Sequence, residues 1–210
     1  MPRKSSCRIE SLFFWLGDVL LPPLWKVAFQ VSPESEDSVS LTTQADWINL
    51  SKQLSIGRLS PAEFLDKIGR APGKPVTPPE FPSLLGTWKA ADPRLLDLAE
   101  ELVARFQLYL ISDYPATWLE AAWQSSSLER VFSWDKVSFT EEMNVLEPDV
   151  QVIQKLAEAG IFHTGKSLLV DADPLRTLQA VQAGYDSTVF VDARRLRRDL
   201  GLWGVFQDTE

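Results

Sequence analysis

The sequence predicts an α/β protein with a Rossmann-like parallel sheet flanked by helices and a small all-helical insertion after the first strand. Three observations support this fold class. Short, nearly unbroken apolar runs recur along the chain, as expected for parallel strands that are buried on both faces. Each run is followed by a polar turn and then by a helix-like segment. Between the first two runs lies a long stretch that lacks strand signals and contains most of the prolines.

Four segments carry the strand pattern. The first is residues 9–16, and shorter runs follow at residues 108–111, 168–170 and 188–191. Strands of this kind pack between two layers of helices, because a parallel sheet needs a crossover connection on one face or the other for each pair of neighbouring strands.

The helices that follow these strands have well-marked ends. Four of them begin next to a proline, at Asp92-Pro93, Pro115, Pro148 and Pro174. Gly160 and Gly184 close the last two, as glycine just past the final turn usually does. Leu178 and Val181 are the apolar residues that mark the last of these four helices.

The predicted insertion spans residues 22–91. Residues 1–21 and 92–210 then form the α/β core. Because the insertion follows the first strand and precedes the next helix of the core, it is expected to be a separate small helical domain.

Two helices are predicted inside the insertion, at residues 42–54 and 60–68. Ser60 and Glu63 have the spacing of a capping box at the start of the second helix. Residues 31–40 are rich in serine, glutamate and aspartate, so we expect them to be a mobile acidic loop.

The charge balance limits the classes of partner. A formal net charge of −8 at pH 7 argues against nucleic acid and anionic membranes as partners, because both require basic patches. Residues 194–198 contain four arginines, and we interpret them as the solvated face of a C-terminal helix. Residues 9–21 are apolar but contain Glu10 and Asp18, so they predict a buried strand and not a secretion signal.

Cysteine and histidine are nearly absent. Cys7 is the only cysteine and His163 is the only histidine. This excludes a disulfide framework and a Cys/His zinc site, and it favours a reducing compartment, which we take to be the cytoplasm. We expect His163 to be a surface residue, because it has no second histidine or cysteine with which to form a site.

The turn after the first predicted strand resembles the first motif of the haloacid dehalogenase-like (HAD) superfamily. That motif reads approximately Phe-Asp-Leu-Gly-Gly-Val-Leu or Phe-Asp-Leu-Asp-Gly-Val-Leu, and residues 14–20 here read Phe-Trp-Leu-Gly-Asp-Val-Leu. The insertion is similar to the helical cap that one HAD subfamily carries after its first strand. Matching cap features are Trp47, residues 57–60 (Gly-Arg-Leu-Ser) and Glu63-Phe64.

Three later segments resemble the remaining HAD motifs, and the resemblance covers nearly the whole chain. The second motif, an apolar strand that ends in serine or threonine, is similar to the strand ending at Ser112-Asp113. The third motif, Lys-Pro-Asp, has Glu147 in place of its lysine. The fourth motif, with paired aspartates before Ser-Pro, corresponds to Asp171-Ala172-Asp173.

This resemblance implies an active site that has lost its chemistry. The family's reaction uses an attacking carboxylate, a second carboxylate as acid/base, a charge-balancing lysine and fourth-motif aspartates that help hold Mg²⁺. The resemblance assigns these positions to Trp15, Gly17, Glu147 and, for one of the aspartates, Ala172. A tryptophan neither attacks phosphorus nor ligates Mg²⁺, and a glutamate reverses the charge that a phosphate dianion needs. No catalytic residue is therefore predicted, and Asp171 is the one candidate metal ligand.

Three functions follow as hypotheses. The leading one is a catalytically inactive HAD-like protein, a pseudoenzyme, that binds a protein partner and needs no cofactor; a homo-oligomer is compatible with it. The alternative is a residual HAD-type phosphatase or hydrolase that uses Asp18 or Asp113 with Asp171 and Mg²⁺. The third is a small-ligand sensor in which Trp15 forms a stacking wall of the old cleft.

Each candidate residue also has a structural interpretation. Trp15 is expected to plug the former cavity, with the stacking platform as the alternative. Asp18 becomes a displaced nucleophile only if the strand register shifts. Asp173 is expected to cap the following helix and Asp171 to be held by neighbouring amides, the alternative being a cation site shared with Asp18 or Asp113.

Overall fold

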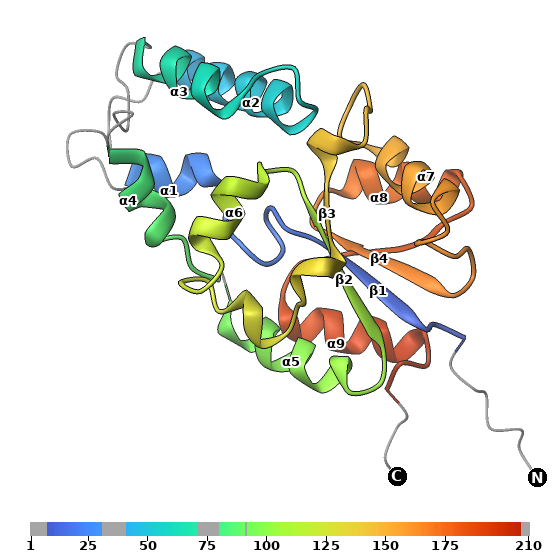
Figure 1. Ribbon diagram of the computed structural model, residues 1–210. Coiled ribbons are helices and arrows are strands. Elements are labelled where there is room, and N and C mark those ends of the chain that lie inside the picture. The colour runs from blue at the N-terminus through green and yellow to red at the C-terminus, as the bar shows by residue number, and fades with distance from the viewer. Residues whose placement is uncertain (1–7, 31–40, 71–79, 91, 207–210) are drawn as a thin grey trace, which may run out of the picture.

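The computed structural model describes residues 8–30, 41–70, 80–90 and 92–206, and their strands form one parallel sheet of five strands. The strand order is β3-β2-β1-β4-β5, so β1 lies at the centre (Figure 1). The strands are β1 (Ser11–Trp15), β2 (Gln107–Ser112), β3 (Val137–Phe139), β4 (Ser167–Asp171) and β5 (Asp186–Val189). The predicted α/β class with a parallel sheet is therefore confirmed.

β1 is buried along its whole length, because β2 and β4 pair with it on its two sides. All four predicted strands are present, although β5 begins and ends two residues earlier than the apolar run at 188–191. The sequence does not predict β3, because three residues are too few to carry a recognisable pattern.

Helices cover the sheet on both faces. α5 (Pro93–Val103) and α9 (Ala193–Leu202) lie together on one side, and α7 (Val150–Glu158) and α8 (Pro174–Gln182) lie together on the other (Figure 1). α6 (Ala116–Ala122) follows β2. The predicted helix ends are confirmed where glycine closes α7 and α8, since Gly160 and Gly184 have φ values of 71° and 87°.

α8 presents an unexpected face to the core. Leu178 and Val181, the apolar residues that mark it in the sequence, are 52% and 54% exposed. Thr177 and Ala180 are buried instead. The apolar pattern therefore identifies this helix but does not identify the face that is buried. Arg176 points inward on that buried face.

In the described part of the segment between β1 and α5, the regular elements are all helices and no strand occurs. It contains α1 (Leu24–Gln30), α2 (Leu41–Ser55), α3 (Pro61–Arg70) and α4 (Phe81–Gly86). α2 and α3 match the two predicted helices, whereas the sequence does not predict α1 and α4, which are short and adjoin prolines. The predicted acidic loop at 31–40 lies outside the described residues.

The inserted helices attach to the core through aromatic side chains. The ring of Phe64 on α3 lies 5.4 Å from the rings of both Trp47 on α2 and Trp118 on α6. The predicted capping box is present, because the Ser60 N–H donates to the Glu63 carboxylate (2.8 Å) and the Glu63 N–H donates to the Ser60 hydroxyl (3.2 Å). The exact division into a core (1–21 and 92–210) and a cap (22–91) stays a prediction.

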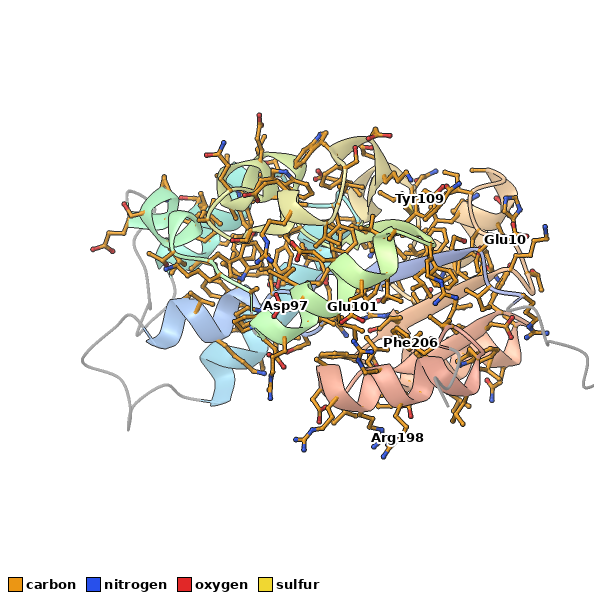
Figure 2. All side chains as sticks on the ribbon, turned by 90° about the horizontal axis from the view of Figure 1, so that it is seen from below. Glu10, Asp97, Glu101, Tyr109, Arg198 and Phe206 are labelled. Atoms are coloured by element: carbon orange, nitrogen blue, oxygen red, sulfur yellow. The ribbon has the colours of Figure 1, made fainter. Side chains whose placement is uncertain are left out.

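The arginine cluster at 194–198 lies on the outer surface of α9, as predicted. Arg197 forms an ion pair with Glu101 on the neighbouring α5, and Arg198 is exposed (Figure 2). His163 is also exposed, as predicted. Among the described residues, no helix has the length and apolar character that a membrane span requires.

Candidate functional site

β1 ends at Trp15, after which the chain turns toward α1. The Leu16 N–H donates to the carbonyl of Ile111 (2.8 Å), which continues the β1–β2 pairing past the strand end. Asp18 has a φ of 61°, and its N–H donates to the carbonyl of Leu21 (2.8 Å), which closes the turn. The register of β1 against β2 is regular up to Trp15, so Asp18 is not shifted into the position that Trp15 holds.

Trp15 is fully buried. The guanidinium carbon of Arg176 lies 3.6 Å from the centroid of the indole ring. A guanidinium over an indole face attracts it by about 2 kcal/mol when both are desolvated. The ring has no exposed surface, and Arg176 covers its face, which is what the interpretation of Trp15 as a plug predicts.

Arg176 is the site residue that sequence reasoning missed. Its Nη2 donates to Asp171 Oδ1 (2.9 Å), its Nε donates to Asp171 Oδ2, and its Nη1 donates to the carbonyl of Pro148 (3.0 Å). Asp171 is fully buried, and the Arg176 side chain is only 14% exposed. Burial alone lowers the pKa of Arg176, but the hydrogen bonds and charge of Asp171 outweigh this effect and raise it. Arg176 is therefore a buried cation between Trp15 and Asp171.

The first turn of α8 explains how Arg176 reaches this place. Asp173 caps the helix as predicted, because its carboxylate accepts from the N–H groups of Leu175 (2.8 Å) and Arg176 (3.3 Å). Asp171 also accepts from the Asp173 N–H (2.9 Å). The prediction that amides hold Asp171 is thus confirmed for one amide, while the main partner is Arg176. One feature of the sequence could have pointed to Arg176: it is a basic residue in the helix turn that directly follows the aspartates of the fourth motif.

Asp113 and Ser112 follow the end of β2. The Ser112 hydroxyl is buried and is bonded within its own turn, since it donates to the Tyr114 carbonyl (2.9 Å) and accepts from the Tyr114 N–H (3.2 Å). Asp113 Oδ1 and Trp15 Nε1 are both buried and have no hydrogen-bond partner of normal geometry among the described residues. A β-carbon added at Gly17 would lie 3.4 Å from both Asp113 oxygens, so Gly17 packs close to this carboxylate.

Burial raises the pKa of Asp113, and the charge of Arg176 and the nearby Trp15 indole N–H offset only part of that effect. The charged form of Asp113 therefore destabilises the fold. Ser112, in contrast, has both its donor and its acceptor capacity used locally, so it is not directed toward a ligand.

Two further candidate positions, Asp18 and Glu147, lie apart from the pair of Arg176 and Asp171. Asp18 is exposed and forms an ion pair with Lys26 (3.3 Å). Glu147 is exposed as well, and it does not line the cavity described next, although its neighbour Pro148 does. The resemblance places Glu147 at the position of a catalytic lysine, but the positive charge at this site comes from Arg176.

A cavity of about 600 Å³ lies between α2 and the carboxyl ends of the strands. Its walls come from the turn after β1, from the segments that follow β2, β4 and β5, and from one face of α2. The lining residues are Gly17, Asp18, Pro23, Ile48, Ser51, Lys52, Ser55, Asp113, Tyr114, Pro148, Ala172, Asp173, Arg176, Phe190 and Val191. The structure thus brings five of the predicted site residues to one cleft.

The donor set does not fit Mg²⁺, the metal that the HAD resemblance implies. Both oxygens of Asp171 already accept hydrogen bonds from Arg176, whose cationic group lies against them. Mg²⁺ requires near-octahedral oxygen coordination, and no group of three or more carboxylate, histidine or cysteine side chains could hold a metal within the described part of the chain. A divalent cation and the Arg176 guanidinium would compete for the same carboxylate.

Asp113 supports a prediction about stability. Replacing it with asparagine removes the buried charge, so we expect the free energy of unfolding at pH 7 to rise by about 1–2 kcal/mol. Because the folded-state pKa of Asp113 is raised, the folded protein takes up this proton first as the pH falls. The gain should therefore shrink with falling pH and vanish below the ordinary aspartate pKa of about 3.9.

Urea denaturation of the wild type and Asp113→Asn across this pH range measures the effect. Asp97→Asn, an exposed change on α5, is the matched control and should not show the same pH dependence. A less stable Asp113→Asn variant at pH 7 would contradict the prediction.

These features define an α/β protein of HAD-like architecture, with a helical segment over the strand ends and a buried arginine in the cleft. Comparison with solved structures gives the same fold. A predicted HAD-like family hydrolase from Porphyromonas gingivalis superimposes with a TM-score of 0.65 at 18% identity, covering 95% of this chain and 100% of that one. The chain therefore has the fold of the HAD-like hydrolases.

Two further structures support this fold. A HAD family enzyme from Bacteroides thetaiotaomicron, which has also been solved with magnesium and inorganic phosphate, gives a TM-score of 0.65 at 20% identity over 90% of this chain and 98% of that one. L-2-haloacid dehalogenase from Xanthobacter autotrophicus gives 0.62 at 14% identity over 92% and 83%. No family model matches the sequence, and no curated protein matches it significantly.

Proposed function

We propose that this chain is a catalytically inactive HAD-like protein that acts by binding a protein partner. One observation carries the proposal: the Arg176 guanidinium lies between Trp15 and Asp171, ion-paired with the latter. By the HAD resemblance, this is where the attacking carboxylate and the metal ligand would face each other. An indole and a neutralised aspartate leave neither an attacking group nor a free ligand.

Other positions support the same proposal. Gly17 supplies no acid/base group, and the exposed Glu147 supplies no cation to the cleft. Covalent phosphoryl transfer requires a nucleophile within reach of the phosphorus atom, and removing a catalytic nucleophile alone lowers kcat by orders of magnitude. The side chain of Arg176 fills the space between Trp15 and Asp171, so the packing of the protein itself disfavours catalysis at this site.

Exposed apolar side chains favour a protein as the partner. Leu175, Leu178 and Val181 form a stripe along the outer face of α8, and each is more than half exposed. Contiguous exposed apolar residues are commonly found at interaction surfaces. A net charge of −8 argues against nucleic acid and anionic membranes, and a second copy of the chain remains among the protein partners we consider.

Enzymatic assays test the proposal against its rival, a residual phosphatase or hydrolase that uses Asp18 or Asp113. Purified protein with p-nitrophenyl phosphate and Mg²⁺ should show no turnover above a protein-free blank. The rival predicts measurable turnover that Asp18→Asn or Asp113→Asn abolishes. A haloacid substrate should be assayed in parallel, because the structural neighbours include dehalogenases.

Turnover by the wild type that persists through repeated purification and disappears in one of these variants would refute the proposal. Arg198→Gln is the matched control. Arg198 lies on the outer face of α9 (Figure 2) and does not line the cavity, so the change should not alter turnover under either hypothesis.

A further inference from the structure

The cleft is asymmetric in charge. Three acidic residues line it, Asp18, Asp113 and Asp173, against two basic residues, Lys52 and Arg176. The charge of Arg176 is already matched by Asp171 behind the cavity wall. Asp18 is paired with Lys26, and Lys52 is exposed, so the acidic groups of the cleft and their partners exceed the basic groups by one charge. An anion entering this cleft would meet a net negative charge.

Asp113 is the acidic group in the cleft that has neither an ion pair nor a helix cap, although the Trp15 indole N–H lies near it. Its Oδ1 is buried and accepts no hydrogen bond of normal geometry within the described residues, in contrast to Asp18 and Asp173, which have an ion pair and a helix cap. Because Asp113 lines the cavity, a ligand there can donate a hydrogen bond to its carboxylate, which no ion pair occupies. A cationic donor binds more strongly, because the interaction is charge-assisted.

The walls beside these charges are apolar. Ile48 on α2 and Val191 after β5 line the cavity and are 39% and 55% exposed, and Pro23 and Phe190 also line it. A volume of about 600 Å³ is within the range of small-ligand sites. Such walls bury a hydrocarbon stem while an acidic group holds its polar end.

We propose that this cleft binds an ammonium or guanidinium group on an apolar stem, with the carboxylate of Asp113 receiving the cation. This inference rests on the proposed function and deepens it, because it names what a non-catalytic cleft recognises. The chemistry occurs in a free alkylamine and in a lysine or arginine side chain of a partner protein. It is the opposite of phosphate recognition, since the acidic lining repels a dianion.

Titration with small probes tests this assignment. n-Butylammonium and n-butylguanidinium should bind the wild-type protein saturably by calorimetry and ligand-observed NMR, whereas inorganic phosphate should not. Asp113→Asn should weaken the binding of both cations by at least about tenfold, because the charged acceptor is lost. Asp97→Asn is an equal charge change at an exposed residue of α5 that does not line the cavity (labelled in Figure 2), and it should leave the affinities within about twofold.

A blocked tripeptide, acetyl-Leu-Lys-Leu-amide, separates the two sources of the cation. Tighter binding of the peptide than of n-butylammonium indicates a side chain of a partner protein, and tighter binding of the free amine indicates a small ligand. Circular dichroism checks that Asp113→Asn is folded. If it is not, the preference of the wild type for the cations over phosphate decides the matter.

Phosphate binding in place of the cations, or equal cation affinity in the wild type and a folded Asp113→Asn, would overturn the inference. Either result is distinguishable from a failure of the proposed function, which shows as turnover. A protein without turnover that ignores both cations would keep the proposed function and lose this inference.

Discussion

Replacing Arg176 with methionine is expected to lower the free energy of unfolding by about 3–5 kcal/mol. The substitution retains much of the side-chain volume but leaves Asp171 fully buried and without its cation. It also removes the guanidinium from the face of Trp15 and the hydrogen bond to the Pro148 carbonyl. Urea denaturation measures the change at pH 7.

Two further variants test whether the loss of stability comes from the ion pair between Arg176 and Asp171. Arg198→Met, on the exposed surface of α9, removes the same charge and should change stability by less than about 0.5 kcal/mol. The double variant Asp171→Leu with Arg176→Met removes both charges and should recover most of the loss, because apolar residues often replace a buried ion pair at little cost. A single Arg176→Met variant as stable as the wild type would mean that Asp171 is not held by Arg176.

Elements with an uninterrupted physical signal were predictable from the sequence. β1 and β4 are apolar and buried on both faces, and α7 and α8 end where glycine permits a positive φ. The capping box at Ser60 is a purely local arrangement, so its residues suffice to predict it. α1 and α4 were not predictable in this way, since their short sequences carry little periodicity and tertiary packing decides their conformation.

The candidate site was predictable only in part. The sequence placed Trp15 at the strand end and Asp173 at the helix cap, and both are found there. Arg176 was missed because an arginine in the first turn of a helix is normally solvated. Only the orientation of α8, with Leu178 and Val181 facing outward, turns it inward. The pairing of Arg176 with Asp171 depends on how α8 leaves β4, which is a property of the assembled fold and not of either residue.

Replacing Trp15 with aspartate, which reinstates a carboxylate at the strand end, should not produce a phosphatase. The change empties the volume of a fully buried indole and places a second carboxylate near Asp171, so we expect a loss of about 3–5 kcal/mol or more in the free energy of unfolding. Arg176 would then be shared between two acids, and no lysine enters the cleft in place of Glu147. The measurements are urea denaturation and p-nitrophenyl phosphate turnover with Mg²⁺.

The variant Trp15→Phe separates the effect of lost packing volume from the effect of the new carboxylate in Trp15→Asp. Phenylalanine keeps an aromatic face beneath Arg176 and loses only part of the buried volume, so its cost should be well below that of the aspartate variant. Turnover gained by Trp15→Asp but not by Trp15→Phe would show that a single carboxylate is enough to restart the chemistry, and that Arg176 yields its place to a metal ion. Absence of turnover in a folded Trp15→Asp protein is the result expected if Arg176 stays paired with Asp171 and keeps that carboxylate from a metal ion.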